Sequence, residues 1–415
     1  MRSRALNPRI ALATFATFAT FAAMSLGTTA VHAQISDNAV RIGVLADMSG
    51  AYSADGGPGF ALGARMAVED FGGEVNGKPI ELLVADDQNK PDVGTGIARR
   101  WIEQDKVDTI VTTSASSIAL SVNGLMKQYQ KPYLLAGTGS SDLTGKACSP
   151  MNINFAFDTY MLPKGTVQAL IGQGLKTFFF ITVDYTVGTT MQAEAARFVE
   201  ALGGKVVGSV KHPLGATDFS SYVLQAQASK AQVVMVLNFT SDTVNTLKAA
   251  GDFRLAKGGQ VLAVPSMTAN SVAAIGLDLA QGMQFTTPQY WDRNDENRAF
   301  SRRFMERHKG GVPTLTQATA YSAVTHYLKA VQATGSDDGP AVVARMKATP
   351  VNDFQMKNVP IREDGIVLRP TYLAKVKTPA ESKSKYDNQI IGQEIPGEQI
   401  WRPLAEGGCD FVKAR

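Results

Sequence analysis

Cysteine is nearly absent from this sequence, with two residues among 415. Two thiols are too few for a four-cysteine zinc site or for a scaffold held by many disulfides. Charge of one sign is also scarce, because 41 Lys and Arg face 37 Asp and Glu and leave a net charge of +4. A nucleic-acid-binding protein would carry a larger, clustered basic excess. The 44% hydrophobic content is too high for a disordered chain and too low for a protein with many membrane spans.

Recognisable catalytic groups are equally scarce. Beyond residue 33 the sequence has three histidines, His212, His308 and His326, and none pairs with another at a metal-ligand spacing. Neither the G-x-S-x-G motif of hydrolases nor the phosphate loop G-x-x-x-x-G-K-[ST] occurs. These absences favour a binding protein over an enzyme, and we expect no cofactor and no metal.

Two patterns superficially suggest a cofactor or metal site. Gly56-Gly57-Pro58-Gly59 is glycine-rich, but it lies well beyond the first expected strand, whereas a dinucleotide loop needs a tight strand-to-helix turn. Asp86-Asp87 ends another expected strand, where paired acids could bind a metal. Solvated carboxylates, or carboxylates that cap a neighbouring helix, are the alternative for this pair.

The first 33 residues have the pattern of a secretory signal peptide. Arg2, Arg4 and Arg9 precede an apolar run over residues 10–30, and Val31-His32-Ala33 then forms a small-x-Ala cleavage site. A permanent membrane anchor is the alternative, because the run is long enough to span a bilayer. Cleavage after Ala33 would remove three arginines and no acid, which lowers the net charge from +4 to +1. We therefore expect a soluble, exported protein.

Export changes the expectation for Cys148 and Cys409. In an oxidising compartment two cysteines are expected to form a disulfide, which would tie the C-terminal tail to the middle of the chain. Two free buried thiols are the alternative.

Short apolar runs alternate with helical periods along most of the chain. The length leads us to expect two domains. A first group of strands and a second group, separated by helix-length segments, indicate two similar α/β lobes with parallel sheets. The expected strands are 40–46, 80–85, 109–112 and 132–136, followed by 177–183, 205–210, 232–238 and 260–264. Weaker strands are expected at 366–368 and 371–376, in a tail that braces the lobes.

Two donor-rich turns follow adjacent expected strands. Residues 113–117 read Thr-Ser-Ala-Ser-Ser and lead into a helix expected over 118–130, and residues 136–141 read Ala-Gly-Thr-Gly-Ser-Ser. Open α/β sheets bind ligands at the carboxyl ends of their strands. Free N–H groups at the start of a helix suit a carboxylate, so the two turns could form an anion site. Ordinary helix capping by these Ser and Thr residues is the alternative.

Residues 40–50, the pair Asp86-Asp87, the turn at 113–117 and Thr138-Gly139 together resemble one family. It is the leucine/isoleucine/valine-binding type of extracytoplasmic solute-binding protein, which serves ABC importers. The resemblance implies a periplasmic monomer with two Rossmann-like lobes joined by three crossovers, which captures a small ligand and delivers it to a membrane permease. It places the crossovers near 154–157, 285–288 and 366–370. The first lobe would comprise 38–155 plus 286–367, and the second 156–285 plus 368–415.

The resemblance also implies ligand contacts from both lobes. In the first lobe they fall on Ala115, Ser116 and Ser117 and on Gly137, Thr138 and Gly139. In the second lobe they fall on Asp184, Tyr185 and Phe239, and Trp291 lies at the mouth after the second crossover.

One departure from the family pattern concerns the ligand. Amino-acid binders of this family carry an acid after the strand that matches 260–264, where it pairs with the ligand's ammonium; here Pro265-Ser266-Met267-Thr268 has none. Gly139 also replaces the family's Thr. An unpaired buried ammonium would be costly, and Tyr290-Trp291 could stack on a flat ligand or pack the hinge. The sequence therefore resembles the subgroup that binds aromatic carboxylates.

Other functions stay open. A branched-chain or other amino-acid-binding protein of the same transporter family is the nearest alternative. The fold also serves as the ligand-sensing part of receptors, and an exported enzyme is a further alternative.

Overall fold

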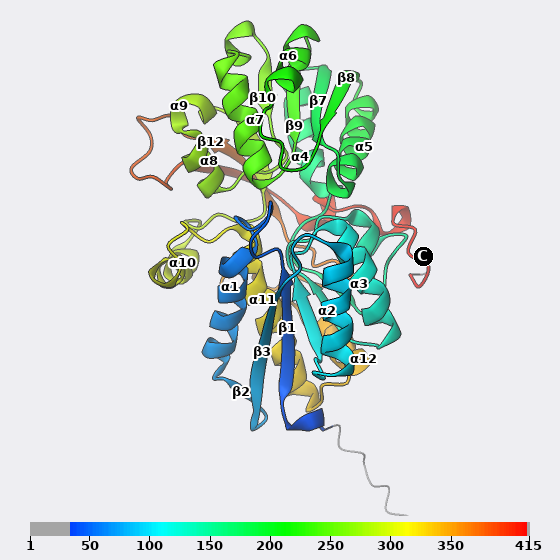
Figure 1. Cartoon of the computed structure of the whole chain (residues 1–415). Coiled ribbons are helices and arrows are strands. Elements are labelled where there is room, and N and C mark those ends of the chain that lie inside the picture. The colour runs from blue at the N-terminus through cyan, green and yellow to red at the C-terminus, as the bar shows by residue number, and fades with distance from the viewer. Residues whose placement is uncertain (1–33, 413–415) are drawn as a thin grey trace, which may run out of the picture. The chain divides into compact units, whose positions relative to one another are not determined.

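The computed structural model describes residues 34–412, so the signal peptide expected over 1–33 lies outside the described residues. The first of its sheets has the strand order β2-β3-β1-β4-β5-β6. Of these strands, β3 and β1 lie side by side in Figure 1. All neighbours in this sheet run parallel except β2 and β3. The strands are β1 (Val40–Ala46), β2 (Glu74–Val75), β3 (Lys78–Asp86), β4 (Thr109–Thr112), β5 (Tyr133–Leu135) and β6 (Asn152–Asn154).

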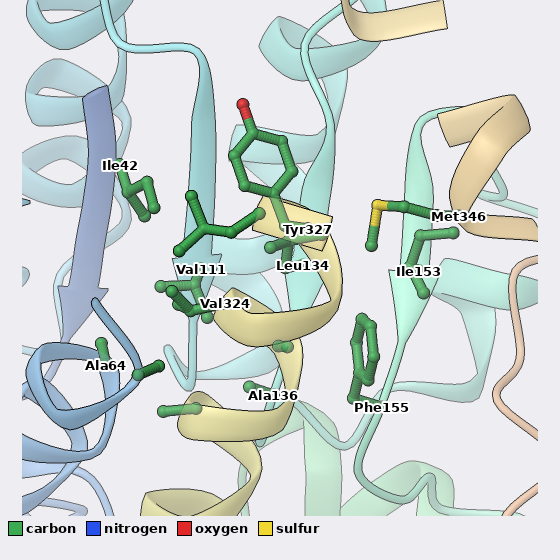
Figure 2. Close-up of a cluster of buried hydrophobic side chains, with 14 of the residues drawn as sticks. Ile42, Ala64, Val111, Leu134, Ala136, Ile153, Phe155, Val324, Tyr327 and Met346 are labelled. Atoms are coloured by element: carbon green, nitrogen blue, oxygen red, sulfur yellow. The ribbon is translucent and has the colours of Figure 1, made fainter. Parts of the chain in front are cut away.

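Successive side chains of a strand point to opposite faces of the sheet. In β1 both sets are largely buried, and helices cover both faces of the first sheet. Ile42 and Val44 face one core and Leu45 faces the other. In Figure 2 the first core is filled by Val324 and Tyr327, which lie among side chains from the strands. We call this sheet and its helices the first lobe. Its helices are α1 (Gly57–Phe71), α2 (Pro91–Glu103), α3 (Ser116–Gln128), α10 (Asp295–Arg307), α11 (Leu315–Thr334) and α12 (Gly339–Ala348).

The second sheet is parallel throughout, with the order β10-β9-β7-β8. Along β7, Phe178 and Phe180 face one core, while Phe179 and Ile181 face the other. We call this sheet and its helices the second lobe. Its strands are β7 (Thr177–Val183), β8 (Lys205–His212), β9 (Val233–Leu237) and β10 (Val261–Ala263). Its helices are α4 (Met161–Gly172), α5 (Thr186–Ala201), α6 (Ser220–Ala228), α7 (Thr240–Asp252), α8 (Ala269–Ile275) and α9 (Leu277–Ala280).

A third, antiparallel sheet has the order β11-β12-β13 and packs against the second lobe. Phe285, Ala374 and Val376 from this sheet join one core of the second lobe. The sequence predicted the strand at 371–376 but neither of its partners. The strands are β11 (Gln284–Thr287), β12 (Thr371–Val376) and β13 (Gln389–Ile395).

The chain passes between the two lobes at residues 155–160, 288–294 and 367–370. A buried arginine, Arg369, joins these three segments. Its guanidinium donates to Phe155 O at 3.0 Å and to Pro288 O at 3.0 Å. The resemblance placed the crossovers near 154–157, 285–288 and 366–370; residues 285–287 belong instead to β11, so the second passage begins at Pro288. The residue boundaries given above for the lobes stay a prediction.

The C-terminal tail returns to the first lobe. Cys148 and Cys409 are joined by a disulfide across a sequence separation of 261 residues. Arg402 donates to Ser141 O at 3.0 Å, and Trp401 Nε1 donates to Arg369 O at 3.1 Å. The tail around α13 (Gly397–Ile400) therefore connects the first lobe with the passages between lobes.

Candidate functional site

A cavity lies between the two lobes, at the carboxyl ends of β4 and β5 and of β7, β9 and β10. It has a volume of about 660 Å³, open space at its mouth included. Its walls are mostly apolar, with hydroxyl groups at several points. The lining residues are Tyr52, Asp55, Gly56, Thr113, Ser114, Ala115, Ser116, Gly137, Gly139, Phe157, Val187, Phe239, Thr240, Ser266, Thr268, Thr314, Leu315 and Thr316.

The start of α3 forms one wall. Ala115 precedes the helix and makes no side-chain capping hydrogen bond, so the first N–H groups of α3 keep their donor capacity. Ser116 is 2% exposed, and its Oγ has no hydrogen-bond partner among the described residues. A buried hydroxyl without a partner is unfavourable unless a ligand or water satisfies it. With the positive end of the helix dipole, this wall suits an anion.

The turn before α3 is held by buried polar contacts. Ser114 Oγ donates to Asp87, whose pKa is raised by burial although this hydrogen bond opposes the shift. Asp86 accepts from Met48 N at 3.0 Å and from Ser49 Oγ at 2.7 Å. Both acids thus fix loops: Asp87 is fully buried and neither acid caps α2, so this role differs from the solvated or helix-capping carboxylates that were the alternative to metal binding. Within residues 34–412 no group of three or more His, Cys, Asp or Glu could hold a metal ion.

The second turn packs closely against the first. A Cβ at Gly137 would lie 2.1 Å from Thr113 Oγ1, so the two turns can approach only with glycine there. Thr138 Oγ1 donates to Ser114 O at 2.9 Å. Thr138 is 1% exposed and does not line the cavity. It therefore fixes the two turns together, and Gly137 and Gly139 form the wall.

The second lobe contributes the opposite wall. The rings of Phe157 and Phe239 are stacked with centroids 6.0 Å apart, and Val187 lies beside them. Thr240 has φ of 49°, an unusual value for a β-branched residue. Its Oγ1 donates to Ala51 O, in the loop after β1 of the first lobe, at 2.7 Å. These contacts hold the lobes together around an apolar space.

Ser117 and Tyr185 form a second contact between the lobes. Ser117 Oγ and Tyr185 OH lie 2.5 Å apart, and the rings of Tyr185 and Tyr52 have centroids 6.5 Å apart. Neither Ser117 nor Tyr185 lines the cavity. In this structure they join the two lobes beside the cavity instead.

Two further residues expected at the site, Asp184 and Trp291, do not line this cavity. The side chain of Asp184 is 62% exposed and pairs with Lys211 at 3.1 Å, because it turns outward at the end of β7. Trp291 donates from Nε1 to Tyr386 O at 2.9 Å and packs with Tyr290. Trp291 also lines a smaller pocket that shares Ser266, Thr268, Thr314 and Leu315 with the cavity. Hinge packing and ligand contact both stay predictions for Trp291.

Sequence reasoning missed two segments of the first lobe that line the cavity. Tyr52 and Asp55 come from the loop after β1, and Thr314–Thr316 come from the start of α11. The spacing of Thr314 and Gln317 is a capping-box signal that marks this helix start. No local pattern marks Asp55, because the fold alone brings that loop to the cavity.

Asp55 is the one carboxylate in the lining, and no Lys, Arg or His lines the cavity within residues 34–412. Burial raises the pKa of Asp55 from 3.8 to about 6. Burial also raises the pKa of Tyr52 above its usual value, with Tyr185, Asp242 and Asp47 adding to the shift. The cavity thus holds one poorly solvated acid and no compensating positive side chain.

Asp55→Asn should stabilise the ligand-free protein above pH 7. The folded state binds the Asp55 proton more tightly than the unfolded chain, so stability falls as pH rises from about 4 to about 6. Replacing the acid should raise the free energy of unfolding by about 1–2 kcal/mol, after allowance for the residual exposure of Asp55 to the cavity. The measurement is Tm of both proteins at pH 4 and pH 8. Equal Tm values of the two proteins at pH 8 would contradict the claim that the ionised Asp55 carboxylate destabilises the folded state.

Comparisons with known proteins agree with this fold. A family model described as periplasmic binding protein matches residues 39–385. The chain belongs to this family. A Leu/Ile/Val-binding protein homolog from Brucella suis is 26% identical over 321 residues, which cover 75% of this chain and 79% of the homolog.

Solved structures are similar over most of the chain. A periplasmic binding protein from Burkholderia mallei is 43% identical with a TM-score of 0.88, and the match covers 91% of this chain and 100% of that one. A branched chain amino acid ABC transporter periplasmic ligand-binding protein from Burkholderia xenovorans is 36% identical with a TM-score of 0.80, covering 89% and 99%. A solute binding protein from Rhodopseudomonas palustris, solved with 3,4-dihydroxy benzoic acid, shares the fold at 21% identity, a TM-score of 0.79 and coverage of 87% and 98%.

No helix within residues 34–412 combines the length and the apolar character needed to cross a membrane.

Proposed function

We propose that this periplasmic binding protein captures a small carboxylate, an aromatic acid, between its two lobes and hands it unchanged to the permease of an ABC importer. The observation that carries the proposal is the unpartnered Oγ of Ser116 at the uncapped start of α3, inside a cavity with apolar walls. A carboxylate satisfies this hydroxyl and the free N–H groups together.

The apolar walls support an aromatic body for the ligand. Phe157 and Phe239 offer ring faces, and Val187 and Leu315 complete the apolar surface. A flat ring gains contact with such walls through stacking and burial. Contacts from both lobes to one ligand favour the closed arrangement, since binding then stabilises that arrangement over any other.

An amino acid is the second candidate ligand. The stretch after β10 lacks the acid that pairs with an ammonium in the resembling family, but Asp55 supplies a carboxylate from the other lobe. The ligand-binding protein from Burkholderia xenovorans is described as a branched chain amino acid ABC transporter component, which supports this candidate.

Isothermal titration with benzoate, cinnamate and leucine tests the proposal. Binding of any of these with one-to-one stoichiometry supports it, and the relative affinities separate the two candidates. Silence towards all three carboxylates would overturn it. NMR of the ligand after long incubation should show no new product, whereas turnover would indicate an enzyme.

Ser116→Ala should weaken carboxylate binding about tenfold or more. A hydrogen bond to a charged group contributes about 1.5–3 kcal/mol, and Ala removes the hydroxyl without changing the backbone. Ser121→Ala is the matched control, because Ser121 is an exposed residue of the same helix whose Oγ donates to Ser117 O. Titration of both variants checks this, and equal affinities would remove Ser116 from the site.

We also propose that the exported chain is cleaved after Ala33. Arginines, an apolar run and a small-x-Ala site in the first 33 residues support this. Intact-mass analysis of protein recovered from the periplasm should give a chain that begins at Gln34. A mass that includes residues 1–33 would contradict cleavage.

A further inference from the structure

The loop after β1 holds Asp55 firmly at the cavity. Asp55 O accepts hydrogen bonds from the hydroxyls of Thr314, at 3.0 Å, and Thr316. Both threonines belong to the start of α11, so the backbone of Asp55 is fixed by a distant element of the first lobe. The position of its carboxyl at the cavity is thus set by the fold and not by a mobile surface loop.

The Asp55 carboxyl has no partner among the residues that the structure describes. No side-chain hydrogen bond or ion pair to it is found among residues 34–412, although it is largely surrounded by protein. An unpaired acid in a poorly solvated place destabilises the folded chain, and Asn or Leu would fit there without that penalty. Acids kept in a cleft at a cost to stability are candidates for functional groups.

In the described part of the chain, no other charged side chain lines the cavity with Asp55. The turns after β4 and β5, the starts of α5, α7 and α11, and the stretch before α8 contribute only uncharged residues. Tyr52 is the other titratable residue of the lining, and Asp47 and Asp242 lie near Tyr52. A partner for the Asp55 carboxylate must therefore arrive with the ligand.

We propose that Asp55 determines ligand specificity by accepting a hydrogen bond from a donor group of the bound carboxylate, a hydroxyl, an amino group or an ammonium. The inference rests on the proposed function, because it assumes that the cavity binds a carboxylate at α3. It names the ligand class more narrowly: hydroxy- or amino-substituted aryl acids, or amino acids. A carboxylate without a donor leaves Asp55 unpaired and adds a second negative charge to the same cavity.

Asp55 also links ligand binding to proton uptake. When an anion without a donor enters, repulsion raises the pKa of Asp55 further, and the carboxyl takes up a proton during binding. A ligand that donates to Asp55 leaves the carboxyl ionised, and no proton is taken up. The enthalpy of binding measured in buffers of different ionisation enthalpy reports this proton directly.

Matched ligand pairs test the proposal by isothermal titration at pH 7. The pairs are the three hydroxybenzoates against the corresponding fluorobenzoates, and leucine against 4-methylpentanoate. In the wild-type protein at least one donor-bearing ligand should bind at least tenfold more tightly than its match, without proton uptake. Its match should bind with uptake of a proton.

Variants then assign the preference to Asp55. Asp55→Leu should bring the affinity ratio of the preferred pair close to one and abolish proton uptake. Asp55→Asn keeps the size of the side chain and should reduce the ratio, which covers the case in which the Leu variant does not fold. Asp92→Asn is the control, because Asp92 is an exposed acid of the first lobe, and its ratio should equal that of the wild type.

The outcomes separate this inference from the proposed function. A wild-type ratio near one for every pair, or a ratio that Asp55→Leu leaves unchanged, overturns the role of Asp55 while carboxylate binding stands. Silence of the wild-type protein towards the whole panel overturns the proposed function and this inference with it.

Discussion

Arg369→Met is expected to lower the free energy of unfolding by about 3–5 kcal/mol and to weaken ligand binding. The guanidinium donates to Phe155 O, Thr319 Oγ1, Pro288 O and Gln355 Oε1, and Arg369 is 1% exposed. Phe155 and Pro288 belong to the other two passages between the lobes. One side chain thus fixes the three segments about which the lobes can turn.

The magnitude follows from two opposing effects. Burial lowers the pKa of Arg369 from 12.5 to about 10, so keeping the guanidinium charged inside the protein costs about 3 kcal/mol. Against this, each hydrogen bond from a charged donor contributes about 1.5–3 kcal/mol, and four acceptors lose their partner in the variant. The hydrogen bonds outweigh the burial cost, and the net change is destabilising.

Urea denaturation of wild type, Arg369→Met and Arg369→Lys measures the stability change. Lysine keeps the charge but lacks the planar fork that reaches Phe155 and Pro288 together, so it should recover only part of the loss. Arg402→Met is the matched control, since Arg402 is a buried arginine that contacts Ser141 of the first lobe. Arg402→Met should lower the free energy of unfolding without weakening ligand binding. Equal effects of Arg369→Met and Arg402→Met on affinity would contradict a role of Arg369 at the hinge.

The sequence predicted the central strands closely because their signal is local. The strands at 40–46, 109–112 and 177–183 coincide with β1, β4 and β7. These strands are almost entirely buried, so they read as continuous apolar or β-branched runs. By contrast, β11 pairs with β12 across more than 80 residues, and β13 is largely exposed. Neither feature leaves a local pattern, and the third sheet was not predicted.

One part of the candidate site was predicted because its signal is also local. A donor-rich turn that leads into a helix is visible in the sequence, and it marks the start of α3. Which of Ser116 and Ser117 faces the cavity depends on where the helix begins, since consecutive helical residues point about 100° apart. The structure turns Ser116 into the cavity and Ser117 towards Tyr185.

Residues supplied by distant segments could not be predicted. Asp55 and Thr314 are 259 residues apart in sequence, and a hydrogen bond between them helps to form one wall. The missing acid after β10 suggested a ligand without an ammonium. Because Asp55 brings an acid from the other lobe, that argument no longer excludes an amino acid.

The disulfide between Cys148 and Cys409 should contribute about 5 kcal/mol to the free energy of unfolding. The bond closes a loop of 261 residues, and cross-linking a loop of this length removes a large part of the unfolded chain's conformational entropy. In Cys148→Ser/Cys409→Ser the tail keeps the contact of Trp401 with Arg369 O, so the fold persists with a lower urea midpoint. Dithiothreitol should lower the midpoint of the wild type and leave that of the double variant unchanged.

The same bond also bears on ligand binding through the tail. Ile400 and Trp401 pack in one cluster with Ala156, Phe157 and Leu315, and the last two line the cavity. Because the disulfide lies beyond this cluster, its loss loosens the tail but leaves the cluster's own contacts in place. Affinity for a carboxylate should therefore fall less than threefold in Cys148→Ser/Cys409→Ser, well below the expected effect of Ser116→Ala. A larger loss would show that the disulfide, and not packing around Trp401, keeps this wall of the cavity in position.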